Sequence, residues 1–65
     1  MMTTNQLYET IRDFIGDMER EETDRTRRFI ELNPTHKYTR YMQRDAYMAA
    51  LLELRHKLHD LRDKL

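Results

Sequence analysis

The chain has 65 residues, of which 37% are charged and 38% are apolar, and its formal net charge is zero. A chain this short buries only about 60% of the surface that its unfolded form exposes, so folds of this size usually depend on disulfides, a metal or association. Because the sequence contains no cysteine, disulfides and thiolate metal sites are excluded, and we expect oligomerisation to complete the fold.

The first predicted element is an amphipathic helix over about residues 4–32. Thr3 followed by Gln6 matches a capping box, in which the two side chains satisfy backbone N–H groups at the helix start. A single glycine, Gly16, costs such a helix about 1 kcal/mol relative to alanine but does not force a break. A break at that position, which would give three helices, is the alternative. The apolar stripe has helical spacing and consists of Leu7, Ile11, Phe14 and Met18, resuming at Phe29, Ile30 and Leu32.

A turn is predicted at residues 33–35. Asn33 precedes Pro34, and the residue before a proline is disfavoured in the helical region, so the first helix should end at Leu32 or just before it. Pro34 suits the first turn of a new helix, with Asn33 or Thr35 as the cap.

The second predicted helix runs over about residues 35–64 without another glycine or proline. Its far half carries an alternating four-three seam of the coiled-coil kind. This seam consists of Tyr47, Leu51, Leu54, Leu58, Leu61 and Leu65. A second apolar line is rotated from the seam and consists of Tyr38, Tyr41, Met42, Met48 and Leu52. A helix with two apolar lines is expected to pack against two neighbours.

These elements predict an all-α fold. Two helices of nearly equal length joined by a few residues make an antiparallel two-helix hairpin. A single hairpin cannot cover both sides of its apolar seams, so we expect it to associate into a homodimeric four-helix bundle or a higher oligomer. The expected oligomer interface consists of Leu7, Ile11, Phe14, Met18, Tyr47, Leu51, Leu54, Leu58 and Leu61.

The zero net charge conceals a regional polarity. Residues 1–24 hold two basic residues against seven acids, a net charge of −5, and residues 25–44 hold six basic residues against one acid, a net charge of +5. The acidic segment around Glu21 and Glu22 is expected to be a solvated helix face. Two alternatives are a contact surface for a basic protein partner and a polar layer that fixes the register of the bundle.

Near the turn, both predicted seams change from apolar to basic. Arg40 lies eighteen residues before Leu58, or five full helical turns, so the two share one face. Cations at a helix start are disfavoured by the helix dipole, and a bound phosphate would relieve that cost. Tyrosines nearby could stack on a base or donate hydrogen bonds. The expected ligand-binding residues are Arg25, Arg28, His36, Lys37, Tyr38, Arg40, Tyr41 and Arg44.

The alternative for this basic corner is purely structural. Asp45 and Glu31 could pair with some of the cations, and long Arg or Lys side chains can cover apolar surface while their charged ends reach water. Arg27 and Arg28 also stand near the end of the first helix, where the dipole favours cations.

Catalysis, metals and cofactors are not expected. The sequence contains no serine, no cysteine and only one glycine, so it lacks the usual nucleophiles and a glycine-rich phosphate loop. Glu53 and His56 have the spacing used in di-iron bundles. They fall away from the leucine seam, however, and no second such pair occurs.

Two classes of function remain. The preferred one is a non-catalytic oligomer that sequesters, or regulates through, a phosphate-bearing ligand, either a nucleic acid or a small nucleotide, at the basic corner. The alternative is a small regulatory or inhibitory protein that presents a helix face to a protein target. No apolar run is long enough to cross a bilayer and no signal peptide is recognisable, so we expect a cytoplasmic protein without a membrane partner.

Overall fold

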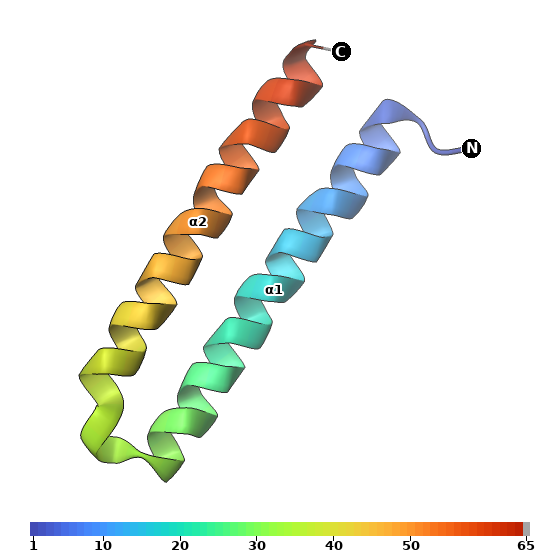
Figure 1. Cartoon of the computed structure of the whole chain (residues 1–65). Helices are drawn as coiled ribbons and strands as arrows, with labels where there is room; N and C mark the ends of the chain where they lie inside the picture. Colours follow the sequence, from blue (N-terminus) through green and yellow to red (C-terminus); the bar gives the residue numbers. More distant parts are fainter. Residues whose placement is uncertain (65) are drawn as a thin grey trace.

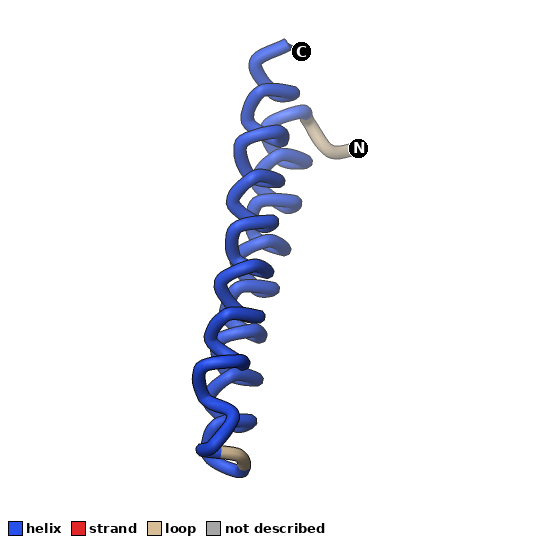
Figure 2. The backbone as a smooth tube through the Cα atoms, turned by 60° about the vertical axis from the view of Figure 1, so that its left-hand side comes forward, coloured by secondary structure: helices blue, strands red, loops and turns tan. Residues whose placement is uncertain are grey.

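The computed structural model describes residues 1–64, which form an antiparallel helical hairpin (Figure 1). Helix α1 spans Thr4–Leu32 and helix α2 spans Lys37–Lys64, with a short 3-10 helix, η1, at Pro34–His36 between them. The hairpin is a single layer whose Cα atoms extend over 47 × 20 × 8 Å. Figure 2 shows loop only at the N-terminus and in the turn. The predicted all-α antiparallel hairpin is confirmed, while Leu65 of the predicted seam lies outside the described residues.

Helix α1 begins at the capping box expected from the sequence. The Gln6 N–H donates to Thr3 Oγ1 at 3.1 Å, and the Thr3 N–H donates to Gln6 Oε1 at 2.8 Å. The helix continues through Gly16 to Leu32, so it does not break as the three-helix alternative required. The side chain of Arg55, from α2, lies against Gly16.

The turn differs in detail from the sequence-based expectation. The backbone N–H and the side-chain amide of Asn33 both donate to the Phe29 carbonyl, at 2.8 and 3.1 Å. Asn33 therefore completes the end of α1 and makes no side-chain cap for the following helix. The second α-helix was expected to begin at about Thr35, but the His36 N–H donates to the Asn33 carbonyl at 3.0 Å and Pro34–His36 form a 3-10 turn. This tighter bonding is common at helix ends, and α2 starts only at Lys37.

The seam between the helices is apolar in one half and polar in the other. We call the tip formed by the two chain termini the open end, and the half of the hairpin that leads to it the open half. In this half Ile15 and Leu51, close to the middle of their helices, are buried, with 2% and 5% of their surfaces exposed. Toward the turn, the buried residues are Glu22 and Thr26. The expectation that the acidic segment is solvated is therefore wrong for Glu22. The reason is register, because Glu22 lies seven residues after Ile15 and so occupies the same stripe of the helix.

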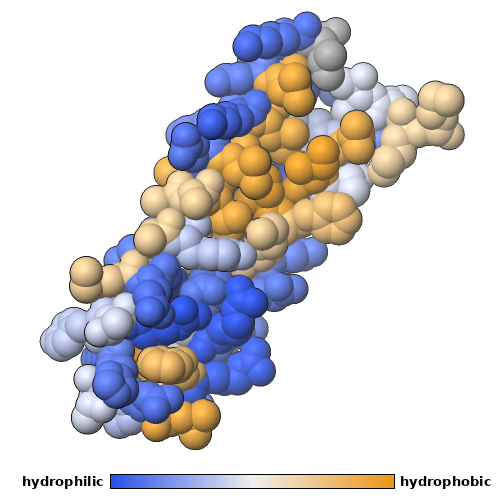
Figure 3. Space-filling model, viewed as in Figure 1, coloured by the Kyte–Doolittle hydropathy of each residue, from blue (hydrophilic) through white to orange (hydrophobic). Residues whose placement is uncertain are grey.

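Much of the apolar surface stays uncovered. Figure 3 shows apolar side chains gathered over the open half of both helices, whereas the turn half is mostly hydrophilic. The most exposed of the predicted interface residues are Leu7, Phe14, Met18, Leu54 and Leu61. Tyr47, Ile11 and Leu58 are half-buried, and Leu51 is already buried within the single hairpin. A large part of the predicted interface is thus available to another molecule.

Candidate functional site: an apolar face and a polar corner

The apolar face consists of the exposed and half-buried apolar residues of the open half: Leu7, Ile11, Phe14, Met18, Leu54, Leu58 and Leu61. On α1 they recur at spacings of four, three and four, and on α2 at four and three, so each set forms one stripe along its helix. Phe14 is 60% exposed and Leu54 is 45% exposed. Side chains of this size normally gain from burial, so the face is suited to packing against further helices.

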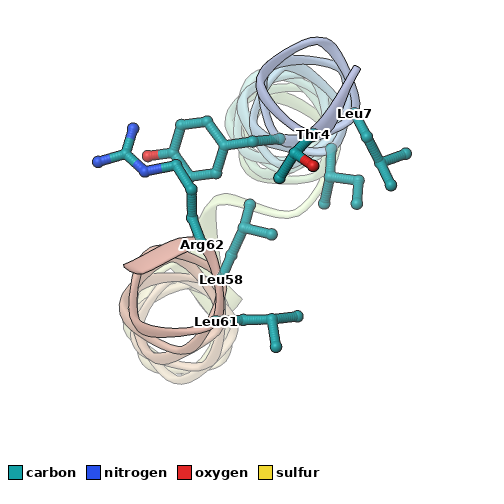
Figure 4. A pocket seen from close by; sticks show the side chains of 7 residues that line it. Thr4, Leu7, Leu58, Leu61 and Arg62 are labelled. Atoms are coloured by element: carbon teal, nitrogen blue, oxygen red, sulfur yellow. The ribbon is translucent and has the colours of Figure 1, made fainter. Parts of the chain in front are cut away.

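A small cleft opens between the two helices at the end of this face (Figure 4). Its volume is about 60 Å³, and its lining is almost entirely apolar. Leu7 and Leu61 project to one side of the hairpin, whereas Arg62 lies on the other side, with its guanidinium 4.4 Å from the centre of the Tyr8 ring. A cleft this small and apolar does not fit a nucleotide. It marks where side chains of a neighbouring helix could insert.

The polar half of the seam is organised by Glu22. This carboxylate is 5% exposed as a side chain, and it accepts from Arg40 Nη2 of α2 at 2.6 Å and from Arg25 Nη2 of α1 at 3.0 Å. The Thr26 hydroxyl lies 3.5 Å from the same carboxylate. Only 17% of the Arg40 side chain is exposed. We call Glu22, Arg25, Thr26 and Arg40 the polar layer, and its Glu22–Arg40 pair joins the two helices.

The single carboxylate of the polar layer offsets one of its two guanidinium charges and accepts hydrogen bonds from both. The hydrogen bond that Arg25 donates to Glu22 raises the pKa of Arg25 above its ordinary value, although partial desolvation opposes the shift. Arg25 also lies over the Tyr47 ring, at 6.0 Å from its centre. Hydrogen bonds to ionised groups are shorter and stronger than neutral ones. Within the described residues, no buried side-chain nitrogen or oxygen lacks a hydrogen-bond partner.

A second ion pair joins the helices near the middle of the hairpin. Arg55 donates to Glu19 Oε1 through Nε at 2.8 Å and through Nη2 at 2.6 Å. The guanidinium lies over Gly16, where a Cβ atom would stand 3.7 Å from Nη2. Glu19 and Arg55 are only about one-third exposed. Two polar contacts therefore join the helices, and their α2 residues, Arg40 and Arg55, lie on opposite sides of the midpoint of α2.

A separate group of cations surrounds Tyr41. The Lys37 ammonium is 5.9 Å from the centre of the Tyr41 ring, and the Arg44 guanidinium is 4.7 Å from it. Arg44 also pairs with Asp45 at 3.0 Å, as the structural alternative anticipated. Tyr38, the residue after Lys37 in the sequence, is 80% exposed. Cations at these distances are attracted to the ring face, so part of this group is satisfied within the chain.

The structure divides the eight residues predicted to bind a ligand among different surroundings. Arg25 and Arg40 belong to the polar layer, whereas Lys37, Tyr41 and Arg44 form the group around Tyr41. Three others lie apart from both groups. Arg28 directs its Nε toward the Asp24 carbonyl at 3.5 Å, and His36 and Tyr38 are exposed.

Sequence reasoning missed Glu22 as the partner of Arg40. The available signal was the seam itself, because Ile15, Glu22 and Thr26 continue one helical stripe at spacings of seven and four. The basic residues of the facing seam were recognised, but their counter-charge was sought in an external ligand. The buried Glu22 carboxylate, paired with the largely buried Arg40 and the half-exposed Arg25, supplies a counter-charge within the chain.

Further observations limit the chemistry of the chain. Among residues 1–64, no three His, Asp or Glu side chains are grouped closely enough to hold a metal ion. Neither helix described here combines the length and the apolarity needed to cross a membrane. Comparisons of the chain with family models, with curated proteins and with solved structures found no match.

Proposed function

We propose that the protein acts without catalysis, through helix-mediated association, and that its working form is a homodimeric four-helix bundle assembled on the apolar face. The observation that carries this proposal is the row of exposed large apolar side chains on one face of both helices. A hairpin that presents such a face matches the way amphipathic helices recognise other helices. A protein target bound on the same face is the regulatory version of this function.

The exposed area supports association. A compact monomer of 8.1 kDa is expected to expose about 4,500 Å², whereas this chain exposes 5414 Å². The excess of about 900 Å² is close to the roughly 800 Å² that each partner contributes to a standard interface. The radius of gyration, 15.2 Å, also exceeds the value of about 11 Å expected for a compact domain of this length. A second layer of helices would bring the exposed area and the radius of gyration per chain closer to the values expected for compact proteins.

The polar layer suits a protein that must pair its helices in one way. Purely apolar seams tolerate slippage, whereas a buried polar group restricts register, most clearly in coiled coils. Shifting α2 by one turn would separate Arg40 from Glu22, so the largely buried Arg40 would lose this partner and Glu22 would keep only Arg25 of its own helix. The layer therefore supports a hairpin that presents its apolar face in a fixed geometry.

A matched pair of leucine variants tests this proposal. Leu54, on the apolar face, and Leu52, on nearly the opposite side of α2, are 45% and 53% exposed. Leu54→Ala should weaken association and make the melting temperature depend more strongly on protein concentration, whereas Leu52→Ala should leave both unchanged. Equal effects of the two substitutions, or a wild-type monomer at every concentration tested, would exclude the apolar face as the interface.

A second candidate function, binding of a phosphate-bearing ligand, is favoured by the group around Tyr41. Lys37 and Arg44 both approach this ring, and the exposed Tyr38 follows Lys37 in the sequence. Ammonium and guanidinium groups with neighbouring hydroxyls are typical phosphate partners. Arg25 and Arg40 contribute less to this candidate than the sequence suggested, because Glu22 already holds them.

Thermal unfolding in the presence of inorganic phosphate, nucleotides and short oligonucleotides tests the second candidate. Binding should raise the melting temperature of wild type and not that of Lys37→Ala. Phe29→Ala, also near the turn but outside the Tyr41 group, serves as a control that should keep the ligand-dependent shift. A wild-type melting temperature that none of these compounds moves would remove the candidate.

A further inference from the structure

From the distribution of charge around the apolar face we infer how the two hairpins of the proposed dimer are oriented. They stack with both turns at the same end, so that α1 of one copy lies against α2 of the other. This inference rests on the proposed homodimer and adds its geometry, which selects one of the two ways in which identical hairpins can stack face to face about a two-fold axis.

The position of the apolar face limits the alternatives. The face occupies only the open half of the hairpin, and the turn half of the same side carries Arg25 and the polar layer. If two hairpins overlapped fully with their turns at opposite ends, each apolar half would cover the polar half of its partner, which costs free energy. Two arrangements bury apolar surface against apolar surface. Either the turns lie at the same end, or only the open ends overlap and the turns point in opposite directions.

The outer edges of the apolar face carry opposite charges on the two helices. On α1, Asp17 follows Phe14 by three residues and Glu21 follows Met18 by three. On α2, the residues three positions after the exposed leucines 54 and 61 are both lysines, Lys57 and Lys64. A shift of three residues turns each side chain about 60° around its helix in the same sense. At these positions the α1 edge carries two acids and the α2 edge carries two lysines, although Glu53, one turn before Lys57 on the same side of α2, forms an ion pair with that lysine.

These edge residues are accessible to a partner. The side chains of Asp17 and Lys57 are 53% and 73% exposed, and their contacts within the chain are surface ion pairs with Arg20 and Glu53. Exposed pairs of this kind are weak and are exchanged at little cost. The two edges run along opposite long margins of the hairpin, one on the outer side of α1 and the other on the outer side of α2. Asp17 and Lys57 of one chain therefore do not meet each other.

The edge charges separate the two remaining arrangements. With both turns at one end, α1 faces the partner's α2, and acidic edges meet basic edges on both sides of the bundle. With the turns at opposite ends, α1 faces the second α1 and α2 faces the second α2, so acid meets acid and lysine meets lysine. Complementary potentials across an interface fix its register, and like charges oppose association. Repulsion between the two turn regions is the cost of the first arrangement. It is reduced in each chain because Glu22 and Asp45, which pair with Arg25, Arg40 and Arg44, offset two of these three positive charges.

A charge-reversal cycle tests the inference, with the dimer dissociation constant as the readout. Lys57→Glu should weaken dimerisation about tenfold, because the two-fold axis repeats each unfavourable contact. Adding Asp17→Lys to the same chain should restore most of the affinity. Within the chain, Lys57→Glu places a carboxylate near Glu53, and Asp17→Lys places an ammonium group near Arg20. Each local effect is unfavourable, so local effects cannot produce this rescue. A dimer that Lys57→Glu leaves unchanged, or that the double variant fails to restore, would overturn the proposed orientation.

A distance measurement provides an independent check. The chain has no cysteine, so Thr35→Cys places a single spin label in the turn. Labels in a dimer with both turns at one end should lie within about 25 Å of each other, since packed helices are 8–10 Å apart. Labels separated by more than the 47 Å length of one hairpin would show opposite orientation and overturn the inference while leaving the dimer intact. A monomer in both experiments would overturn the proposed homodimer as well.

Discussion

Replacing Glu22 by alanine is expected to destabilise the hairpin more than any surface substitution. Glu22 is buried and accepts from Arg40 at 2.6 Å, and Arg40 itself is only 17% exposed. Removing one partner of a fully buried ion pair costs about 3–5 kcal/mol. Because Arg40 retains some access to water, we expect Glu22→Ala to lower the free energy of unfolding by about 2–3 kcal/mol, near or below the lower end of that range. Such a loss is large for a protein of this size.

The comparison that isolates the ion pair is a double replacement. In Glu22→Leu combined with Arg40→Leu, no buried charge remains unpaired, and apolar substitutes for buried pairs are often neutral or stabilising. Arg25, which is half-exposed, can turn to water. The expected order of stability is therefore the double variant equal to or above wild type, and both above Glu22→Ala. Arg40→Ala should also destabilise, whereas an empty anion site at this residue would make its removal neutral or stabilising.

Urea denaturation followed by far-ultraviolet circular dichroism at one fixed protein concentration measures these differences. The fixed concentration matters because association adds to apparent stability. A Glu22→Ala variant within about 0.5 kcal/mol of wild type would refute the burial of this carboxylate, since only surface substitutions are usually so mild. A double variant as unstable as the single one would show that packing, and not the unpaired charge, produces the loss.

Three other predictions concern the ends and the middle of α1. Gly16→Ala should raise the free energy of unfolding by about 0.5–1 kcal/mol, measured by urea denaturation, because the added Cβ would stand no closer than 3.7 Å to a neighbouring side chain. Thr3→Ala should lower it by about 1 kcal/mol in the same assay, because it removes the cap that accepts from Gln6; no loss would contradict the capping box. Since pairing with Glu22 raises the pKa of Arg25 above its ordinary value, the stability due to its charge is fully present below the ordinary pKa of an arginine and is lost only as the pH rises through the raised one. The difference in the free energy of unfolding between wild type and Arg25→Gln should therefore stay constant from about pH 7 to pH 10. A decline of this difference over the same range would contradict the raised pKa.

Local signals account for the part of the fold that the sequence predicts. The capping box at Thr3 depends on residues three positions apart, and the end of α1 depends on the steric effect of Pro34 on its neighbour. The antiparallel hairpin follows from two long periodic segments and a short connection. Gly16 did not break the helix because its cost of about 1 kcal/mol is small beside the contacts of a helix this long.

The polar layer was harder to predict because its partners come from different helices. Whether Glu22 faces water or Arg40 depends on how α2 is rotated and shifted against α1, and composition favours the solvated interpretation for an acidic segment. The start of α2 was also misplaced, since Pro34 is compatible with both an α-helical and a 3-10 first turn. Which seam leucines stay exposed in a single hairpin also depends on the rotation of α2, which buries Leu51 and leaves Leu54 exposed.

Sedimentation of the unmodified chain over a range of concentrations tests the central claim most directly. The apolar face predicts a reversible equilibrium between the 8.1 kDa chain and a species of twice that mass, with the dimer dominant at high micromolar concentration. Leu54→Ala should shift the equilibrium toward the single chain, and Leu52→Ala should not. A single folded species of one-chain mass at every concentration would contradict self-association through this face.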